Sequence, residues 1–521
     1  MRRLILLVSA VILFCPPTGA ETDWTAPLPP LEPWNGKSRE LAIDPSEEWA
    51  TPFEKSGLKS SPGYEETVAW LQELVSAAPE LEMISIGQSA QGRDIWMVVA
   101  SSDETFTPEE LQRSGKPTIL AQAGIHSGEI DGKDAGMMLL RDMTVRRTRG
   151  DLLARANLLF IPILSVDGHE RSGPFSRINQ RGPDEMGWRT NARNLNLNRD
   201  YAKLDTREIR AVVDTINRWK PDLYLDLHVT DGADYQYDIT FGFNGPHAHS
   251  PAIAIWLREE FAPFVDRRLE SMGHIPGPLT FAADELDFSK GIRDWTASAR
   301  FSNGWGDARH LPTVLLENHS LKPFDQRVLG TYVFVEAAMR VAAEKYQELR
   351  RAMEADMERD PESIPLAWEA GDEPALIDFA GIESRFRISP ITGKPYLEWT
   401  GRPVDMRIPL VKFDRPSAEV TKPAAWWIPV QWAEVIERLR AHGVEMETID
   451  SSPELLVEMY RLEDPEFEEK PYEGHVRVSA TPVPEMRKER FPAGSVRIPS
   501  DQPMAELVAL LLEPQSPDSF L

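Results

Sequence analysis

The chain has 521 residues, enough for about two to four domains of ordinary size. Hydrophobic residues make up 41% and charged residues 27%, a balance typical of globular proteins, so hormone-sized peptides and disulfide-stapled miniproteins are excluded. The formal charge of −26 repels phosphate backbones and anionic lipid, so nucleic acid is not an expected partner.

Residues 1–20 have the three zones of a secretory signal peptide: a basic start, a mostly apolar run over 4–14 and small residues before an expected cleavage after Ala20. The run is too short to span a bilayer, and the alternative of a buried first helix is disfavoured because the run is not amphipathic. The single cysteine, Cys15, lies inside this segment. We therefore expect a secreted or periplasmic protein without disulfides and without stable membrane insertion after cleavage.

Residues 21–60 are rich in Pro, Trp and charge without periodicity, which predicts an extended N-terminal arm. From 61 to 345, apolar strand-like runs alternate with helical patterns, and such alternation predicts a mostly parallel sheet covered by helices. The strand-like runs are 81–86, 95–99, 118–123, 158–164, 223–227 and 313–316, and the helical patterns lie near 134–143 and 207–219.

A long charged helix is expected from about 324 to 357, so that 346–370 forms a helical linker. Past residue 370 the composition changes to short strands interrupted by Pro and Arg, with one helix near 432–441. We expect a smaller β-rich C-terminal domain over 371–521. No feature of the sequence indicates an oligomeric state.

The first candidate for metal binding is His126-Ser127-Gly128-Glu129, an imidazole and a carboxylate three residues apart. The same spacing recurs by chance in His442-Gly443-Val444-Glu445. The first pair differs because it follows an apolar strand and precedes a helix. In open α/β sheets, ligands bind beyond the carboxyl ends of the strands.

Three more polar side chains lie at or just beyond the ends of such strands: Asp167, His228 and Glu317. Two imidazoles and one carboxylate form the ligand set of a catalytic zinc ion, so His126, Glu129 and His228 predict one zinc ion per chain. Glu317 fits as the general base, because desolvation at the end of an apolar strand raises its pKa. The alternatives are a hydrogen-bonded core histidine for His228 and an ion pair for Glu317.

The segment 188–201 contains three arginines and four asparagines in an otherwise acidic chain. Arginine binds carboxylates through two parallel hydrogen bonds and can stabilise a developing oxyanion, so this segment predicts an anion site. The alternative is a solvated loop whose arginines pair with surrounding acids.

Together these motifs resemble the zinc carboxypeptidases, the carboxypeptidase A-like family of metallopeptidases, over residues 61–345. The residues that carry the resemblance occur in the family's order: Ile86 to Arg93, His126-x-x-Glu129, Trp188-Arg189, Asn198-Arg199, His228 and Glu317. The glycine-rich stretch from His126 to Gly136 and the appended β-rich domain look like a bacterial secreted branch of the family.

The resemblance implies an α/β fold with a mixed eight-stranded sheet flanked by helices. It also implies that His126, Glu129 and His228 hold zinc and that Glu317 activates water. Arg189 would polarise the scissile carbonyl, and Asn198 with Arg199 would hold the terminal carboxylate of a peptide substrate.

Three positions depart from the pancreatic members of the family. Gly128 stands where they have an arginine. Asn196 stands where they have an acid that supports the first histidine, and we consider Asp167 as a replacement. Their mobile tyrosine has no counterpart except Trp305.

The leading hypothesis is therefore a zinc-dependent metallocarboxypeptidase that hydrolyses the C-terminal peptide bond of peptides with a free carboxylate. One alternative is an amidohydrolase of the same superfamily that acts on acyl-amino acids or peptidoglycan stem peptides. Another is a non-catalytic binding homologue, because fold does not fix function.

Overall fold

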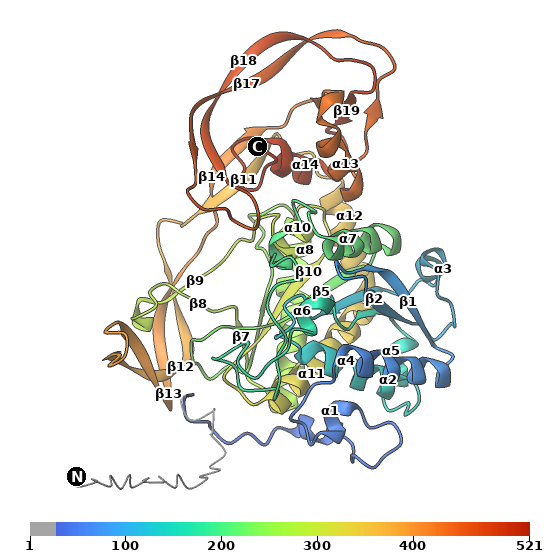
Figure 1. Ribbon diagram of the computed structural model, residues 1–521, viewed down its shortest axis with the longest axis vertical. Coiled ribbons are helices and arrows are strands. Elements are labelled where there is room, and N and C mark those ends of the chain that lie inside the picture. The colour runs from blue at the N-terminus through green and yellow to red at the C-terminus, as the bar shows by residue number, and fades with distance from the viewer. Residues whose placement is uncertain (1–27) are drawn as a thin grey trace, which may run out of the picture.

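A computed structural model describes residues 28–521 of the chain (Figure 1). The expected signal peptide and Cys15 lie outside the described residues. Over 28–521, no helix combines the length and the apolar composition that crossing a membrane requires. The part of the arm that is described contains a short 3-10 helix, Lys37–Leu41, and the helix α1, Pro52–Lys55.

An eight-stranded sheet forms the centre of the molecule, in the spatial order β1-β2-β4-β3-β5-β10-β6-β7. Its strands are β1 Leu81–Gln88, β2 Asp94–Ala100, β3 Thr118–Ala123, β4 Asn157–Ile161, β5 Leu223–Val229, β6 Ile239–Gly242, β7 Pro276–Pro278 and β10 Thr313–Asn318. The central strands β4, β3, β5 and β10 are parallel, whereas β1, β2 and β6 join antiparallel. The sheet is mixed, which confirms the expected fold class.

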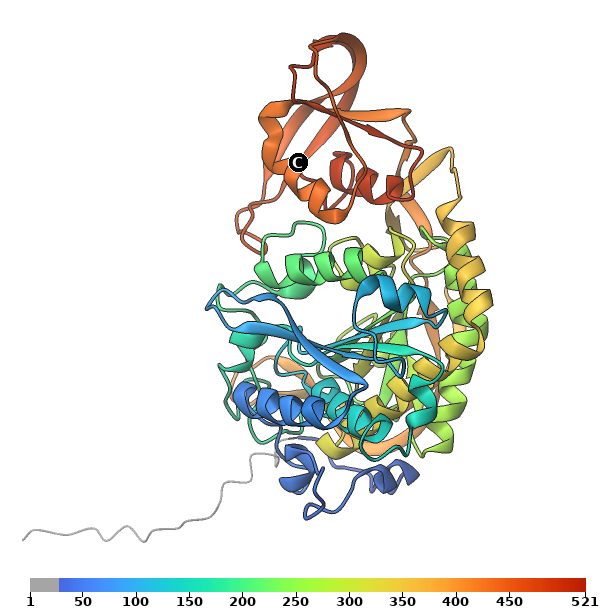
Figure 2. The same cartoon turned by 90° about the vertical axis from the view of Figure 1, so that its right-hand side faces the viewer.

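Helices cover both faces of this sheet (Figures 1 and 2). On one face, α4 (Asp131–Met143) packs on β3 and β5, with α11 (Phe324–Glu344) beside it. On the other face, α7 (Arg207–Trp219) and α10 (Ser302–Asp307) contact the sheet. Because both faces are covered, every residue of β3 and β5 is buried, which explains why apolar residues dominate both strands.

The remaining α-helices of this part of the chain lie around the sheet. They are α2 Tyr64–Ala77, α3 Pro108–Arg113, α5 Gly150–Leu153, α6 Val166–His169, α8 Pro251–Trp256, α9 Ala262–Ser271 and α12 Tyr346–Met357. The single helix expected over 324–357 is wrong. The chain leaves the helical conformation at Lys345, and α11 before this break is largely buried rather than charged and exposed.

The C-terminal region, residues 363–521, is rich in strands, as expected. Its strands are β11 Ser363–Glu369, β12 Ala375–Ile388, β13 Pro395–Val411, β14 Arg415–Thr421, β15 Ala425–Ile428, β16 Glu447–Thr448, β17 Glu454–Phe467, β18 Val478–Arg490 and β19 Val496–Pro499. Its helices are α13 Ala433–His442 and α14 Ala505–Leu512, the first close to the predicted position. β11 begins inside the stretch that was expected to be a helical linker.

The C-terminal region packs against the central part of the molecule rather than standing apart (Figure 2). Buried side chains of α13 and α14, among them Leu439 and Leu507, belong to the same continuous hydrophobic core as the central sheet. In addition, β13 pairs with the short strand β9 (Ile292–Arg293), which itself pairs with β8 (Phe281–Ala282). The two parts are therefore joined by shared core and by shared sheet.

Candidate active site

Three neighbouring strands place the predicted functional residues at one edge of the sheet. His126 follows the end of β3, whereas His228 and Glu317 lie near the carboxyl ends of β5 and β10. Glu317 is directly opposite His228 in the parallel register of these two strands. Paired residues on adjacent strands project from the same face of a sheet, so both side chains lie on the same side.

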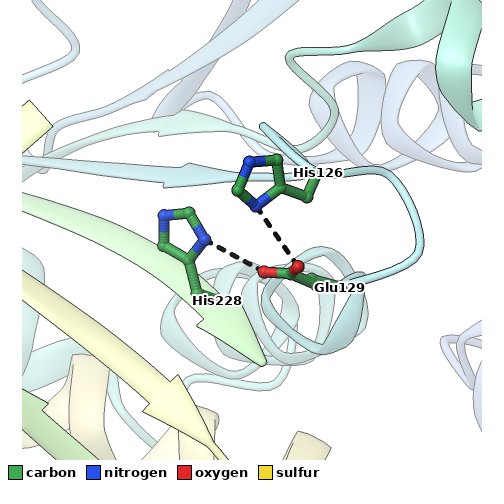
Figure 3. A group of neighbouring side chains, drawn as sticks. All are labelled: His126, Glu129 and His228. Atoms are coloured by element: carbon green, nitrogen blue, oxygen red, sulfur yellow. Dashed lines mark hydrogen bonds and ion pairs between the residues drawn. The ribbon is translucent and has the colours of Figure 1, made fainter. Parts of the chain in front are cut away.

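His126, Glu129 and His228 converge closely enough to bind one metal ion (Figure 3). One ligand atom from each lies within 4.8 Å of the others, and among residues 28–521 no other such group of three occurs. Nδ1 of His126 is 3.2 Å and Nδ1 of His228 is 3.0 Å from the two oxygens of Glu129. Apart from this contact with Glu129, the buried Nδ1 of His126 has no hydrogen-bond partner, although buried polar atoms are almost always paired. Two imidazoles, one carboxylate and this unpaired nitrogen fit a divalent cation such as zinc.

Hydrogen bonds behind the cluster fix the tautomer of each histidine. Nε2 of His228 lies 2.9 Å from Oδ2 of Asp226, and Nε2 of His126 lies 2.8 Å from Oδ1 of Asn196. Both oxygens are acceptors, so each Nε2 carries the proton and each Nδ1 presents its lone pair to the metal position. Asn196 is thus the hydrogen-bond partner of His126.

The expectation that Asp167 supports His126 is wrong. Its carboxylate accepts hydrogen bonds from Ser89 Oγ at 2.9 Å, Gln91 N at 3.0 Å and Arg93 Nη1 at 2.7 Å. Asp167 therefore holds the turn between β1 and β2, because that turn supplies three donors within reach of one buried carboxylate.

Arg177, which the sequence did not single out, supports Glu129. Its Nη1 lies 2.7 Å from Oε1 of Glu129, and its Nη2 donates to two backbone carbonyls beyond β5. Its side chain also explains Gly128, because a Cβ atom there would lie 2.6 Å from Cδ of Arg177 and 2.8 Å from the carbonyl oxygen of Gly187. Arg177 lies in an irregular loop, so no periodic pattern could have revealed it.

The electrostatics of the cluster follow from burial and from these partners. Although burial opposes its ionisation, His126 and Arg177 hold the pKa of Glu129 well below its usual range. Burial raises the pKa of Glu317 to about 8, and its Oε2 has no hydrogen-bond partner. A cation at the cluster would favour the ionised form of Glu317, so this carboxyl group can titrate near neutral pH.

A cavity of about 560 Å³ opens over the cluster and contains every predicted site residue. Arg189 lies on its wall with Nη1 2.8 Å from Oε1 of Glu129. Asn198 is held by its Oδ1, which accepts a hydrogen bond of 3.0 Å from Ser302 N. The guanidinium of Arg199 stacks 4.2 Å above the ring of Phe301. The other apolar side chains of the wall are Val229, Leu279, Phe281, Trp295, Leu315 and Phe413.

Trp305, the only aromatic residue that the sequence offered for the missing tyrosine, does not line this cavity. It is fully buried, and its Nε1 donates to Nδ1 of His442 at 3.1 Å. His442 is accordingly a core histidine, and its chance resemblance to a metal motif has no counterpart in the structure. The aromatic side chains that do line the cavity, such as Trp295 and Phe413, come from irregular segments.

Comparisons with known proteins agree with this site. Residues 67–250 match the family model described as zinc carboxypeptidase, a range that includes His126, Glu129 and His228. Carboxypeptidase 2 from Trichophyton tonsurans is 23% identical over 452 residues, which cover 83% of this chain and 78% of that protein. The chain therefore contains a region, residues 67–250, that matches the zinc carboxypeptidase family, as its motifs predicted.

Two solved carboxypeptidase structures are similar to this chain at low sequence identity. A metallo-carboxypeptidase from Pseudomonas aeruginosa, in complex with (2-guanidinoethylmercapto)succinic acid, is 17% identical, with a TM-score of 0.41 over 55% of this chain and 70% of that one. Carboxypeptidase A from Helicoverpa armigera is 20% identical, with a TM-score of 0.37 over 56% of this chain and 74% of that one.

Proposed function

We propose that the protein is a zinc-dependent carboxypeptidase that hydrolyses the C-terminal peptide bond of peptides carrying a free carboxylate. The main support for this proposal is that all the required side chains line one cavity. It holds the candidate ligands His126, Glu129 and His228, the buried Glu317, and the cationic side chains Arg189 and Arg199. Ligands for one zinc ion, a base and a carboxylate-binding arginine are the parts that exopeptidase chemistry requires.

Each side chain has a defined task in this proposal. When bound, zinc supplies a Lewis acid that polarises a carbonyl and acidifies water. Glu317 accepts the proton of the water that attacks the scissile carbonyl carbon and delivers it to the leaving amine nitrogen as the C–N bond breaks. Arg189 stabilises the developing negative charge on the carbonyl oxygen. Asn198 and Arg199 bind the terminal carboxylate and thereby place the last peptide bond beside Glu317.

The test compares peptides that differ only at the carboxyl terminus. A free carboxylate should give a kcat/KM about 100-fold or more above that of the amidated peptide, because a charge-assisted bidentate contact is lost. Equal values for the two peptides contradict the exopeptidase function and favour the amidohydrolase alternative.

Substitution of the base separates catalysis from metal binding. Glu317→Gln should lower kcat by about 100-fold or more while the zinc content stays at that of the parent. Glu513→Gln is the matched control, because burial also raises the pKa of Glu513 but this residue lies outside the cavity. A Glu317→Gln variant as active as the parent would show that another residue is the base.

We also propose that the protein acts outside the cytoplasm, as a secreted or periplasmic enzyme. The support is the arrangement of basic, apolar and small residues over 1–20. N-terminal sequencing of the protein recovered from the producing cells tests this directly: a mature chain that begins at Glu21 agrees with it, and one that begins at Met1 contradicts it.

A further inference from the structure

A long hairpin of the C-terminal region reaches back to the central part of the molecule. Strands β17 and β18 pair along most of their length, and they arch over the upper part of the view in Figure 1. The loop between them contains a tight turn in which Tyr472 and His475 exchange two backbone hydrogen bonds. We call the four residues Tyr472, Glu473, Gly474 and His475 the hairpin tip.

The hairpin tip contacts the segment that contains two of the site residues. Oε2 of Glu473 accepts a hydrogen bond of 2.7 Å from the backbone N–H of Asn196. Nε2 of His475 lies 2.5 Å from Oδ2 of Asp205, which anchors the far end of the same segment. These contacts join residues that are 277 and 270 positions apart in the sequence.

Tyr472 contacts the arginine that lines the cavity. Its hydroxyl group interacts with the charge of the Arg199 guanidinium. Arg300, which stacks on the Tyr472 ring, donates from Nη1 to the backbone carbonyl oxygen of Arg199 at 3.4 Å. The ring of Tyr472 lies between two other guanidinium groups, with Cζ of Arg300 at 5.0 Å and Cζ of Arg477 at 4.6 Å from the ring centroid. Stacked cations restrict the ring, so its hydroxyl group is held in one place beside Arg199.

The backbone of the hairpin tip is consistent with a functional contact. Glu473 has φ of +49° and Gly474 has φ of +87°, which are the left-handed values of a two-residue hairpin turn. Asn, Asp and Gly are favoured at the first of these positions, and a longer side chain such as Glu costs stability there. The hydrogen bond from Asn196 N–H to the carboxylate of Glu473 offsets this loss of stability.

Asn196 and Arg199 both act on the candidate active site. Oδ1 of Asn196 accepts from Nε2 of His126, a candidate metal ligand, and Arg199 lies on the cavity wall where the substrate carboxylate is proposed to bind. A residue that fixes the backbone of Asn196 therefore acts on the metal ligand. A residue that orients Arg199 acts on substrate binding.

We propose that the hairpin tip is a positioning element of the active site: Tyr472 orients Arg199 for the substrate carboxylate, and Glu473 holds Asn196 in place behind His126. The part that concerns Tyr472 rests on the proposed function. The part that concerns Glu473 rests only on metal binding.

The first experiment measures selectivity for a free carboxylate in the full-length zinc enzyme. Tyr472→Phe removes only the hydroxyl group, so KM for a peptide with a free carboxylate should rise about five- to tenfold with kcat nearly unchanged. The amidated peptide, which does not use Arg199, should show no change. Tyr460→Phe is the matched control, because Tyr460 lies on the same hairpin, in β17, away from the hairpin tip.

The second experiment measures zinc release to a chelator without any substrate. Glu473→Ala should release zinc about three- to tenfold faster than the parent, a smaller effect than the 10- to 100-fold typical of direct partners of a ligand. Glu473→Gln keeps an acceptor oxygen for Asn196 and should restore the parental rate. This rescue distinguishes positioning from a general loss of structure, which thermal unfolding of each variant also measures.

The two experiments test the roles of Tyr472 and Glu473 independently of each other. An unchanged ratio of kcat/KM for free and amidated peptides in Tyr472→Phe overturns the role of Tyr472. A parental rate of zinc release in Glu473→Ala overturns the role of Glu473. If the parent enzyme itself does not distinguish the two peptides, the proposed function fails, and the zinc release rates alone then decide whether the hairpin tip positions the site.

Discussion

Among single residues, Asp226 supports one candidate metal ligand, His228, through a direct contact. Its Oδ2 accepts from Nε2 of His228 and from the hydroxyl group of Ser302 at 2.6 Å, and its Oδ1 accepts from Gln122 at 3.1 Å. Although burial opposes the charge of His228, Asp226 and Glu129 hold its pKa well above the usual range. Asp226 thus fixes the ring and makes it a stronger ligand.

The substitution Asp226→Asn should weaken zinc affinity by about 10- to 100-fold, because a neutral amide accepts more weakly from His228. Competition with a zinc-binding dye measures this. The matched control is Asp238→Asn, which alters another buried carboxylate paired with a histidine, His274, at 2.8 Å and outside the cavity. Equal losses of affinity in the two variants would show that Asp226 acts through folding rather than through His228.

Residues of the site differ in how far the sequence could predict them. His126, His228 and Glu317 were predictable because each lies at the end of an apolar strand, where the architecture alone fixes the location. The role of Asn196 and the involvement of Arg177 were not, because each depends on an irregular loop folding back onto the cluster. Asp167 follows a strand end, as the candidate metal ligands do. It lies elsewhere because the turn after β1 supplies donors to its carboxylate.

At the scale of elements, helix α13 joins the C-terminal region to the central part through His442. Nδ1 of this buried ring accepts from Trp305, and Nε2 lies 3.1 Å from the carbonyl oxygen of Ala202. The ring must therefore be neutral, with its proton on Nε2. Burial lowers the pKa of His442 to about 3.

This arrangement predicts a loss of stability in acid. The folded-state pKa lies below the unfolded value of 6.5, so the contribution of neutral His442 is complete above pH 6.5 and is lost as the pH falls towards 3. Metal-free protein should lose up to about 1.4 kcal/mol per pH unit in this window from this residue. Urea unfolding at several pH values measures it, and His442→Gln should flatten the slope. Identical slopes in the variant and the parent would contradict the prediction.

Element boundaries were predicted well where one pattern acts alone. The limits of β3 and α7 agree with the structure because a turn or a capping residue, such as Thr206 before α7, marks each end. The break at Lys345 was missed, because both α11 and α12 have helical patterns and no proline or glycine separates them. Tertiary packing, which buries α11 but leaves much of α12 exposed, distinguishes the two helices.

At the scale of the whole molecule, the C-terminal region is part of the catalytic unit rather than an appendage. It supplies Phe413 to the cavity wall, the hairpin tip to Asn196 and Arg199, and strand β13 to the sheet that contains β9. None of these long-range contacts has a local signal, so the sequence indicated a β-rich domain without indicating its role.

The shared core predicts cooperative unfolding. Because α13, α14 and the central sheet bury their side chains in one hydrophobic cluster, metal-free protein should unfold in one calorimetric transition. The ratio of calorimetric to van't Hoff enthalpy should then be close to unity, about 1. Two resolved transitions, one of them abolished by removing residues 363–521, would contradict this view of a single unit.

We expect His126, Glu129 and His228 to bind one zinc ion through Nδ1 of both rings and the carboxylate of Glu129. Anomalous diffraction from crystals of the zinc-loaded protein, collected on both sides of the zinc edge, tests this most directly. We predict a single strong peak per chain at ligand distance, about 2.0–2.2 Å, from these three side chains. If that peak is absent, or if the zinc ion lies at the Nε2 atoms instead, these residues do not form the expected site.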